Sequence, residues 1–172
     1  MRNFYVLTYD DRDDLKSVSD YETGDFDLTV FWSGLPYQGL VPENVRLYVE
    51  EGECPDYMAN PISWPIVSEQ LLLHMMKLAP DIQVFPAPLY YENSLQRLTG
   101  YSIVNIVRRI DALSQPFETV NTIVFTCDKI PKDVHLFRIT DHETLVIISD
   151  EMLKELSDKM LRGFAFIKTV SV

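Results

Sequence analysis

The chain has 172 residues, of which 47% are hydrophobic, 24% charged and 12% aromatic; these proportions exclude a disordered protein and suit one packed domain. Its formal net charge of −11 argues against a nucleic-acid-binding protein, because a phosphate backbone needs a basic face and the lysines and arginines are scattered. No apolar run approaches the roughly 20 residues of a membrane helix and the N-terminus lacks a signal-peptide pattern, so we expect a cytoplasmic protein with no membrane partner.

The first part of the chain alternates strand-like stretches with acidic ones. Residues 3–9 have the composition of a strand, and residues 45–49 alternate apolar and polar side chains as a half-buried strand does. Residues 28–32 are apolar enough to predict another strand between these two. A second acidic cluster follows at residues 50–56, after which prolines interrupt regular structure.

An acidic segment, residues 10–27, separates the first two predicted strands, and its serines, aspartates and glycine predict a loop. Eight acidic and two basic side chains leave it with −6 of the total charge of −11. Because acidity accelerates association with a basic partner, we take its carboxylates as candidate partner-binding residues. They are Asp10, Asp11, Asp13, Asp14, Asp20, Glu22, Asp25 and Asp27. Plain solubility is the alternative explanation for the same charge.

The second half contains two similar strand–helix–strand patterns. In residues 66–85 a short strand leads to Ser68, a typical helix N-cap, and the apolar helix that follows should end before Pro80. Residues 147–170 repeat this order after Ser149, and we expect that helix to extend to Gly163. At an offset of 81 residues, Ile66 matches Ile147, Ser68 matches Ser149, Leu72 matches Leu153 and Phe85 matches Phe166. The offset indicates either an internal duplication or two independent examples of a common unit.

The densest apolar run, residues 100–113, predicts one strand buried inside a sheet. Asn105 interrupts it, and a buried amide there needs hydrogen-bond partners. Together with strand-like residues 119–127 and 134–139, the patterns predict an α+β fold with a mixed or largely antiparallel sheet and two main helices. We expect a single domain over residues 1–172, with a strand-rich acidic part (1–62) and a core (63–172).

Three motifs in the second half occur in a distinctive order. Gly-Tyr-x-x-x-Asn-x-x-x-x-x-Asp-Ala-Leu begins at Gly100, His135, Phe137 and Arg138 follow, and Ile-Ile-Ser-Asp-Glu occupies residues 147–151. In this order and spacing the chain resembles, over roughly residues 63–172, a bacterial family of polymorphic-toxin immunity proteins first catalogued as a domain of unknown function. The resemblance implies a cytoplasmic inhibitor that binds one toxin and has no active site.

The sequence contains no recognisable catalytic motif. There is no GxSxG, no glycine-rich phosphate loop, and no spacing of Cys54, Cys127 and the histidines that would suggest zinc or a disulfide. Asp133 with His135, and residues 141–143, are candidate metal ligands, although solvated polar surface is the simpler interpretation. We therefore predict no catalytic residue, no metal and no cofactor.

Three functions remain open. The favoured one is an immunity protein that binds a cognate toxin, one with a basic surface, and neutralises it by stoichiometric occlusion. The alternatives are a small metal-dependent hydrolase with a site assembled from distant residues, and a sensor or scaffold domain that forms a homodimer through an exposed sheet edge. Aromatic residues beside prolines and glycines are candidate interface anchors in the first case.

Overall fold

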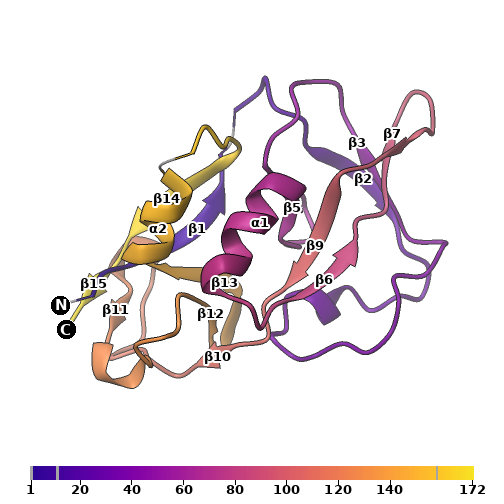
Figure 1. Cartoon of the computed structure of the whole chain (residues 1–172). Coiled ribbons are helices and arrows are strands. Elements are labelled where there is room, and N and C mark those ends of the chain that lie inside the picture. Colours follow the sequence, from indigo (N-terminus) through magenta and orange to yellow (C-terminus); the bar gives the residue numbers. More distant parts are fainter. Residues whose placement is uncertain (1, 11, 158) are drawn as a thin grey trace.

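Two short helices lie next to each other near the middle of the molecule, between its two larger groups of strands (Figure 1). They are α1 (Glu69–Leu78) and α2 (Asp150–Ser157). The computed structural model describes residues 2–10, 12–157 and 159–172. With many strands in mixed and antiparallel sheets, the structure confirms the predicted α+β fold.

Helix α1 forms as its sequence predicts. The Ser68 hydroxyl accepts a hydrogen bond from the Leu71 backbone N–H at 3.1 Å, which satisfies one of the free donors of the first turn. Leu71 and Met75 are buried on one face, and the helix ends at Leu78, before Pro80. At α2 the Ser149 hydroxyl accepts from the Met152 N–H at 3.2 Å in the same way.

Helix α1 joins two strands that lie on either side of a third. It connects β5 (Ile66–Ser68) to β6 (Gln83–Pro86), and β9 (Tyr101–Asn105) runs antiparallel between them. The short strand β4 (Tyr57–Met58) pairs with β5 and completes a four-stranded sheet in the order β4-β5-β9-β6.

Helix α2 makes the same connection in a five-stranded sheet. It connects β13 (His142–Ser149) to β14 (Phe164–Lys168), and β1 (Phe4–Tyr9) runs antiparallel between them. Beside β13 lie β12 (Leu136–Ile139) and then β10 (Arg109–Ile110), which gives the order β10-β12-β13-β1-β14. Both helices therefore span one strand that comes from another part of the chain.

The first of three hydrophobic cores in the described structure lies between the helices and the two sheets. Several of its residues are related by the offset of 81 residues. Val67 and Ile148, Leu71 and Met152, and Met75 and Leu156 are three pairs at this offset, all buried in the same cluster. The apolar pattern therefore predicts correctly that Leu71 and Met75 of α1 and Met152 and Leu156 of α2 face the core.

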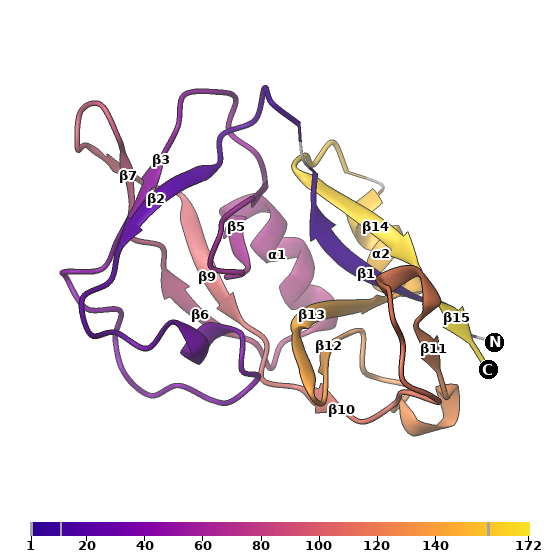
Figure 2. The same ribbon diagram turned by 180° about the vertical axis from the view of Figure 1, so that it is seen from behind.

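A second sheet of four strands covers the other face of the β4-β5-β9-β6 sheet. Its order is β2-β3-β7-β8, with β2 (Val18–Glu22), β3 (Arg46–Val49), β7 (Leu89–Tyr91) and β8 (Arg97–Leu98). Leu47, Val49 and Leu89 point into a core that also contains Phe31 and Trp64. This sheet lies at the end of the molecule away from both termini (Figure 2).

A third core lies beneath the five-stranded sheet. It contains Phe4, Phe125 and Phe137, whose rings meet edge to face, and it is closed by the pair β11 (Val124–Phe125) and β15 (Val170–Ser171). Three 3-10 turns complete the described structure: η1 (Leu28–Phe31), η2 (Val120–Thr122) and η3 (Cys127–Lys129). Within the described ranges no helix has the length and hydrophobicity to cross a membrane.

Three predicted strands differ in the structure. Residues 100–113 form not one strand but β9 and β10, because the chain leaves one sheet after Asn105 and enters the other. Residues 28–32 form η1 rather than a strand, since the Asp27 carboxylate accepts from the Thr29 N–H at 2.9 Å and starts a turn. Residues 119–127, expected as one strand, contain η2 and only two strand residues.

Helix α2 is shorter than predicted. It is described as far as Ser157, and the side chain of Met160, expected to continue the apolar face, is 98% exposed. Gly163 does not end the helix; it adopts φ +93° where its backbone lies against Tyr57, so that an added Cβ would come within 2.5 Å of the Tyr57 carbonyl oxygen.

Candidate partner-binding surface

The acidic candidates of residues 10–27 do not form one cluster. Asp10, Asp13 and Asp14 lie at a corner where the backbone pairs with residues 50–53: the Glu53 N–H donates to the Asp14 carbonyl at 2.8 Å. Asp14 also binds Arg12 at 2.6 Å, and this guanidinium lowers the pKa of the Asp14 carboxyl. Asp11 lies outside the described residues. The first and second acidic clusters of the sequence thus meet in space.

Asp20 and Glu22 lie elsewhere, on β2, in a segment that we expected to be a loop. Both side chains are exposed, and β2 is an edge strand of its sheet, a position that charged residues protect against unwanted pairing. Asp25 is exposed in the turn that follows. Asp27 has a structural role, because its bond to the Thr29 N–H lowers the pKa of its carboxyl.

Beside Asp20 and Glu22, the outward side of the β2-β3-β7-β8 sheet gathers tyrosine and arginine. Strand register places Asp20 opposite Tyr48 and Glu22 opposite Arg46; Tyr48 in turn lies opposite Tyr90, and Tyr90 opposite Arg97. We call this surface the tyrosine face: Asp20, Glu22, Arg46, Tyr48, Tyr90 and Arg97. It runs from an acidic edge on β2, where Glu22 lies opposite Arg46, over two half-buried tyrosines to a basic edge with Arg97 on β8. Tyrosine and arginine are the residue types most enriched among energetically dominant interface contacts.

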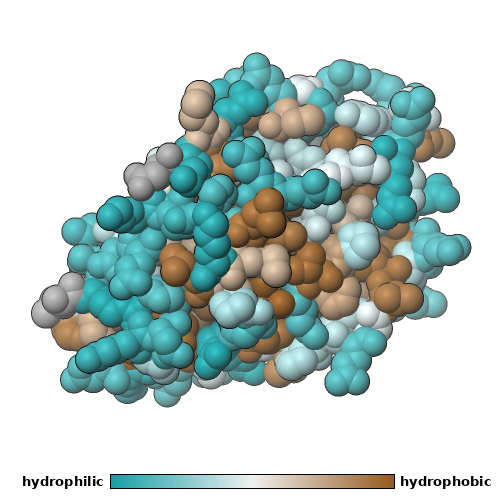
Figure 3. Space-filling view, viewed as in Figure 1, coloured by the Kyte–Doolittle hydropathy of each residue, from teal (hydrophilic) through white to brown (hydrophobic). Residues whose placement is uncertain are grey.

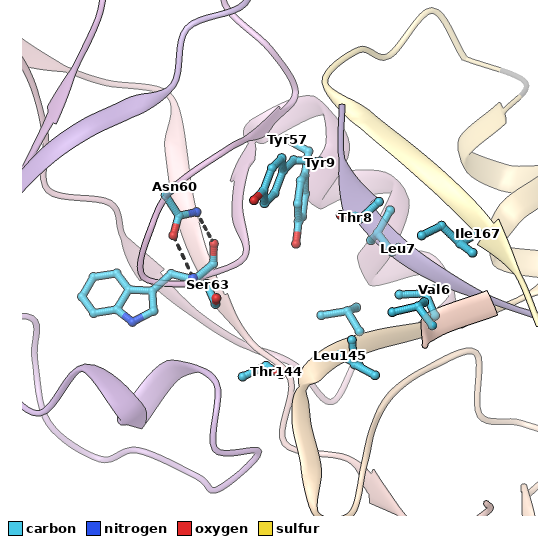
Figure 4. Close-up of a pocket in the computed structure, with 13 residues that line it drawn as sticks. Val6, Leu7, Thr8, Tyr9, Tyr57, Asn60, Ser63, Thr144, Leu145 and Ile167 are labelled. Carbon is cyan, nitrogen blue, oxygen red and sulfur yellow. Dashed lines mark hydrogen bonds between the residues drawn. The ribbon is translucent and has the colours of Figure 1, made fainter. Parts of the chain in front are cut away.

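A cleft opens where two strands of the five-stranded sheet part. β1 pairs with β13 only as far as Leu7 and Val146, so that Thr8 and Tyr9 diverge from Thr144 and Leu145 (Figure 4). The cleft has a volume of about 230 Å³. Tyr57 lines it, and burial raises the pKa of this phenol to about 12, so it stays protonated.

The wall of the cleft is held by a buried amide. Asn60 donates to the carbonyls of Met58 and Trp64 and accepts from the Trp64 N–H at 2.9 Å (Figure 4). Between them Ser63 adopts φ +58°, the left-handed region that serine rarely occupies. Apolar and hydroxyl groups can accept a side chain here, and the described residues that line the cleft include no cluster of charged groups for acid–base work.

A third surface is apolar and lies over α1. Leu73 is 66% exposed and Met76 43% exposed on its outer side, and Val84 of β6, the strand that follows α1, is also exposed. Figure 3 shows hydrophobic residues gathered over this part of the molecule, with hydrophilic ones around them. Contiguous exposed apolar surface of this kind often marks a contact with another protein.

The residues on which the sequence resemblance rests are mostly buried. Asn105 is fully buried, and its amide nitrogen donates to the Leu35 carbonyl and to Gln83 Oε1, both at 2.9 Å. We expected hydrogen-bond partners for the whole amide. The nitrogen has them, whereas Asn105 Oδ1 has no partner among the described residues. His135 Nδ1 lies 2.9 Å from the Ser149 hydroxyl. These side chains support the fold rather than present a surface to a partner.

Arg138 is the largest buried polar side chain in this set. It reaches from β12 to η1, where it donates to the Phe31 carbonyl at 2.9 Å, and it also donates to the Glu143 carbonyl. Burial lowers the pKa of its guanidinium to about 10, and its Nε has no partner among the described residues. Arg138 therefore ties the five-stranded sheet to the other half of the molecule.

The metal candidates of the sequence are not brought together. His135 is buried against Ser149, whereas the His142 ring packs on Phe117 with centroids 4.6 Å apart. The described part of the chain contains no group of three or more His, Cys, Asp or Glu side chains that could hold a metal ion. Cys54 and Cys127 are both free.

Comparison with known proteins identifies a relationship along nearly the whole chain. A sequence model of an immunity protein family, Imm11, matches residues 6–171. The match includes the N-terminal part, 1–62, almost completely, although the motif resemblance covers only the second half. A search of curated proteins found no match.

Proposed function

The chain belongs to the Imm11 immunity protein family, and we propose that it binds one molecule of a cognate toxin and neutralises it by covering the toxin's functional surface. A toxin-neutralising role follows from the family; one-to-one occlusion is our proposal for how it is achieved. The family match is the observation that carries this conclusion. Occlusion needs only a complementary surface, and the chain has several surfaces suited to that purpose.

We place the toxin-binding surface on the acidic edge of the tyrosine face, with Asp20 and Glu22 at its centre and Asp25 close by in sequence. Exposed carboxylates on a protein of net charge −11 attract a basic partner over the range of the Debye length, roughly 8 Å at physiological ionic strength. Tyr48 and Tyr90 supply rigid, amphipathic contact area beside these charges. Asp10, Asp13 and Asp14 of the corner would extend the acidic surface, and Asp11, which lies among them in sequence, stays a candidate.

The direct test is capture of the toxin. The chain is used as bait in the native bacterium, and bound protein is identified and compared with the product of the gene immediately upstream. We expect a toxin-like partner at one-to-one stoichiometry, measured by light scattering of the purified complex. Absence of a partner while the toxin is expressed would contradict the proposal.

A matched pair of variants then tests the surface. Asp20→Lys/Glu22→Lys reverses two charges on the proposed interface, and lysine is well tolerated on an edge strand. Glu118→Lys/Asp128→Lys makes the same change in charge at two exposed positions outside the tyrosine face. Loss of toxin capture with the first variant but not with the second would support the placement; equal capture by both would refute it.

A further inference from the structure

The basic edge of the tyrosine face borders a hollow. Six of its lining residues define it: Leu40 and Pro42 from the loop before β3, Arg46 of β3, Pro88 before β7, Tyr90 of β7 and Arg97 of β8. Its volume is about 550 Å³. Leu40 is 83% exposed at the rim, which leaves a large apolar side chain without cover. We call this hollow the arginine groove.

Within the described structure the two arginines of the groove form no ion pair, although Glu22 on β2 lies opposite Arg46 on β3. Arg12, Arg108, Arg109 and Arg162, by contrast, each pair with a carboxylate. The Arg46 guanidinium lies 5.6 Å from the centre of the Tyr90 ring, a cation–π distance. Tyr90 therefore holds one of the two cations in place above the sheet.

The charge of the groove is opposite to that of the protein. The chain as a whole carries −11, and the acidic edge of the same face lies only two strands from Tyr90. Within the groove Glu43 is an acidic lining residue against two guanidinium groups. Guanidinium groups bind carboxylates with paired, charge-assisted hydrogen bonds, and the apolar rim suits a neighbouring hydrophobic side chain.

We propose that the arginine groove binds an acidic segment of the toxin, with one carboxylate between Arg46 and Arg97 and an adjacent apolar side chain on Leu40 and Pro42. This inference rests on the proposed function. The toxin would then meet the tyrosine face with groups of both signs: basic groups on the acidic edge and an acidic segment in the groove. A partner with that charge pattern fits in one orientation, because the reversed orientation places like charges together.

The test compares the toxin affinity of matched charge variants. Arg46→Glu/Arg97→Glu should bind the captured toxin at least about tenfold more weakly than the wild-type chain does. The neutral variant Arg46→Gln/Arg97→Gln should lose less, and Lys129→Glu/Lys132→Glu, at two exposed positions outside the groove, should stay within about twofold of wild type. Circular dichroism checks that each variant is folded. Wild-type affinity in both arginine variants would overturn the groove proposal while the proposed function stands; no complex with the wild-type chain would overturn both.

A defined probe tests the chemistry without the toxin. Titration with the peptide acetyl-Trp-Glu-Glu-amide, followed by NMR, should shift the resonances of Tyr90 and both arginines, whereas acetyl-Trp-Lys-Lys-amide should not. Loss of the Tyr90 shift in Arg46→Glu/Arg97→Glu supports the proposal, and equal shifts of the wild-type chain with both peptides refute charge recognition. The alternative occupant of the groove is a second copy of this chain, which light scattering tests. If the wild-type chain is a dimer and Arg97→Glu is a monomer, the groove binds the second copy and the proposal is wrong.

Discussion

His74 of α1 and Glu155 of α2 are 81 residues apart in sequence, and their side chains meet, with His74 Nδ1 2.6 Å from Glu155 Oε1. This separation is the same offset that relates the two strand–helix–strand units. Equivalent positions therefore face each other, as at an approximate twofold axis. Lys77 binds the same carboxylate oxygen at 2.7 Å, so the two helices are joined by a small polar network.

The first prediction concerns the pH dependence of this network. Hydrogen bonds from Lys77 and His74 to the Glu155 carboxylate lower the pKa of this carboxyl group from 4.5 to about 2. A carboxyl whose pKa is lower in the folded state stabilises the fold above its ordinary pKa, and this contribution is lost as the pH falls. Glu155→Gln should therefore be less stable than wild type at pH 7, and the difference should shrink between about pH 4.5 and pH 2.

Denaturant unfolding at several pH values checks this, with Glu118→Gln, an exposed carboxylate, as the control. Because Glu155 is partly solvated, the size of the effect depends on salt, so all measurements need one ionic strength. A difference between wild type and Glu155→Gln that is the same at pH 3 and pH 7 would show that the carboxylate charge is not what joins the helices.

The second prediction concerns Asn105, where the chain passes from one sheet to the other. Asn105→Ala removes the donor for the Leu35 carbonyl and Gln83 Oε1 and should lower the free energy of unfolding by about 1–3 kcal/mol. Asn93→Ala, an exposed residue in the turn between β7 and β8, is the matched control and should have little effect. Equal stabilities of the two variants in urea would contradict the structural role of the Asn105 amide.

The third prediction separates the hydrogen bonds of Arg138 from its volume. Arg138→Met fills similar space but leaves the Phe31 and Glu143 carbonyls without their donor, so it should lower the free energy of unfolding by about 1–2 kcal/mol. Arg138→Ala leaves a cavity as well and should cost about 3 kcal/mol. Should Met prove as costly as Ala, the bonds to the Phe31 and Glu143 carbonyls, rather than packing, would account for the effect.

The fourth prediction concerns association kinetics. Asp20→Lys/Glu22→Lys should slow binding to a basic toxin by about tenfold at low salt, and the difference should narrow at high salt because exposed charges are screened. Stopped-flow measurements at several salt concentrations resolve the two rates. A reduction that does not change with salt would indicate a local steric effect in place of electrostatic steering.

The parts of the fold that sequence reasoning predicts are those governed by local rules. Serine is a typical N-cap residue, and Ser68 and Ser149 both cap their helices. The buried positions of α1 follow helical spacing. The offset of 81 residues reflects packing, because Leu71 and Met152 share one core. In each case a few neighbouring residues determine the structure.

The parts that sequence reasoning missed depend on distant contacts. β2 has one buried apolar residue, Val18, followed by exposed ones, so its sequence lacks the alternation of a strand. Its strand conformation comes from pairing with β3. The tyrosine face was only partly predictable. Asp20 and Glu22 are evident from their charge. Arg46 lies beside them through the antiparallel pairing of β2 with β3, whereas Tyr90 and Arg97 reach the same surface only through the pairing of β3 with β7 and of β7 with β8.

The most direct test of the central claim is a titration of toxin activity. The purified toxin is mixed with increasing amounts of this protein, and the remaining activity is measured at concentrations well above the dissociation constant. Stoichiometric occlusion predicts a linear fall that reaches zero at one equivalent. A toxin inactivated by far less than one equivalent would mean that the chain turns over and acts as an enzyme, and full activity in the presence of excess protein would contradict neutralisation by binding.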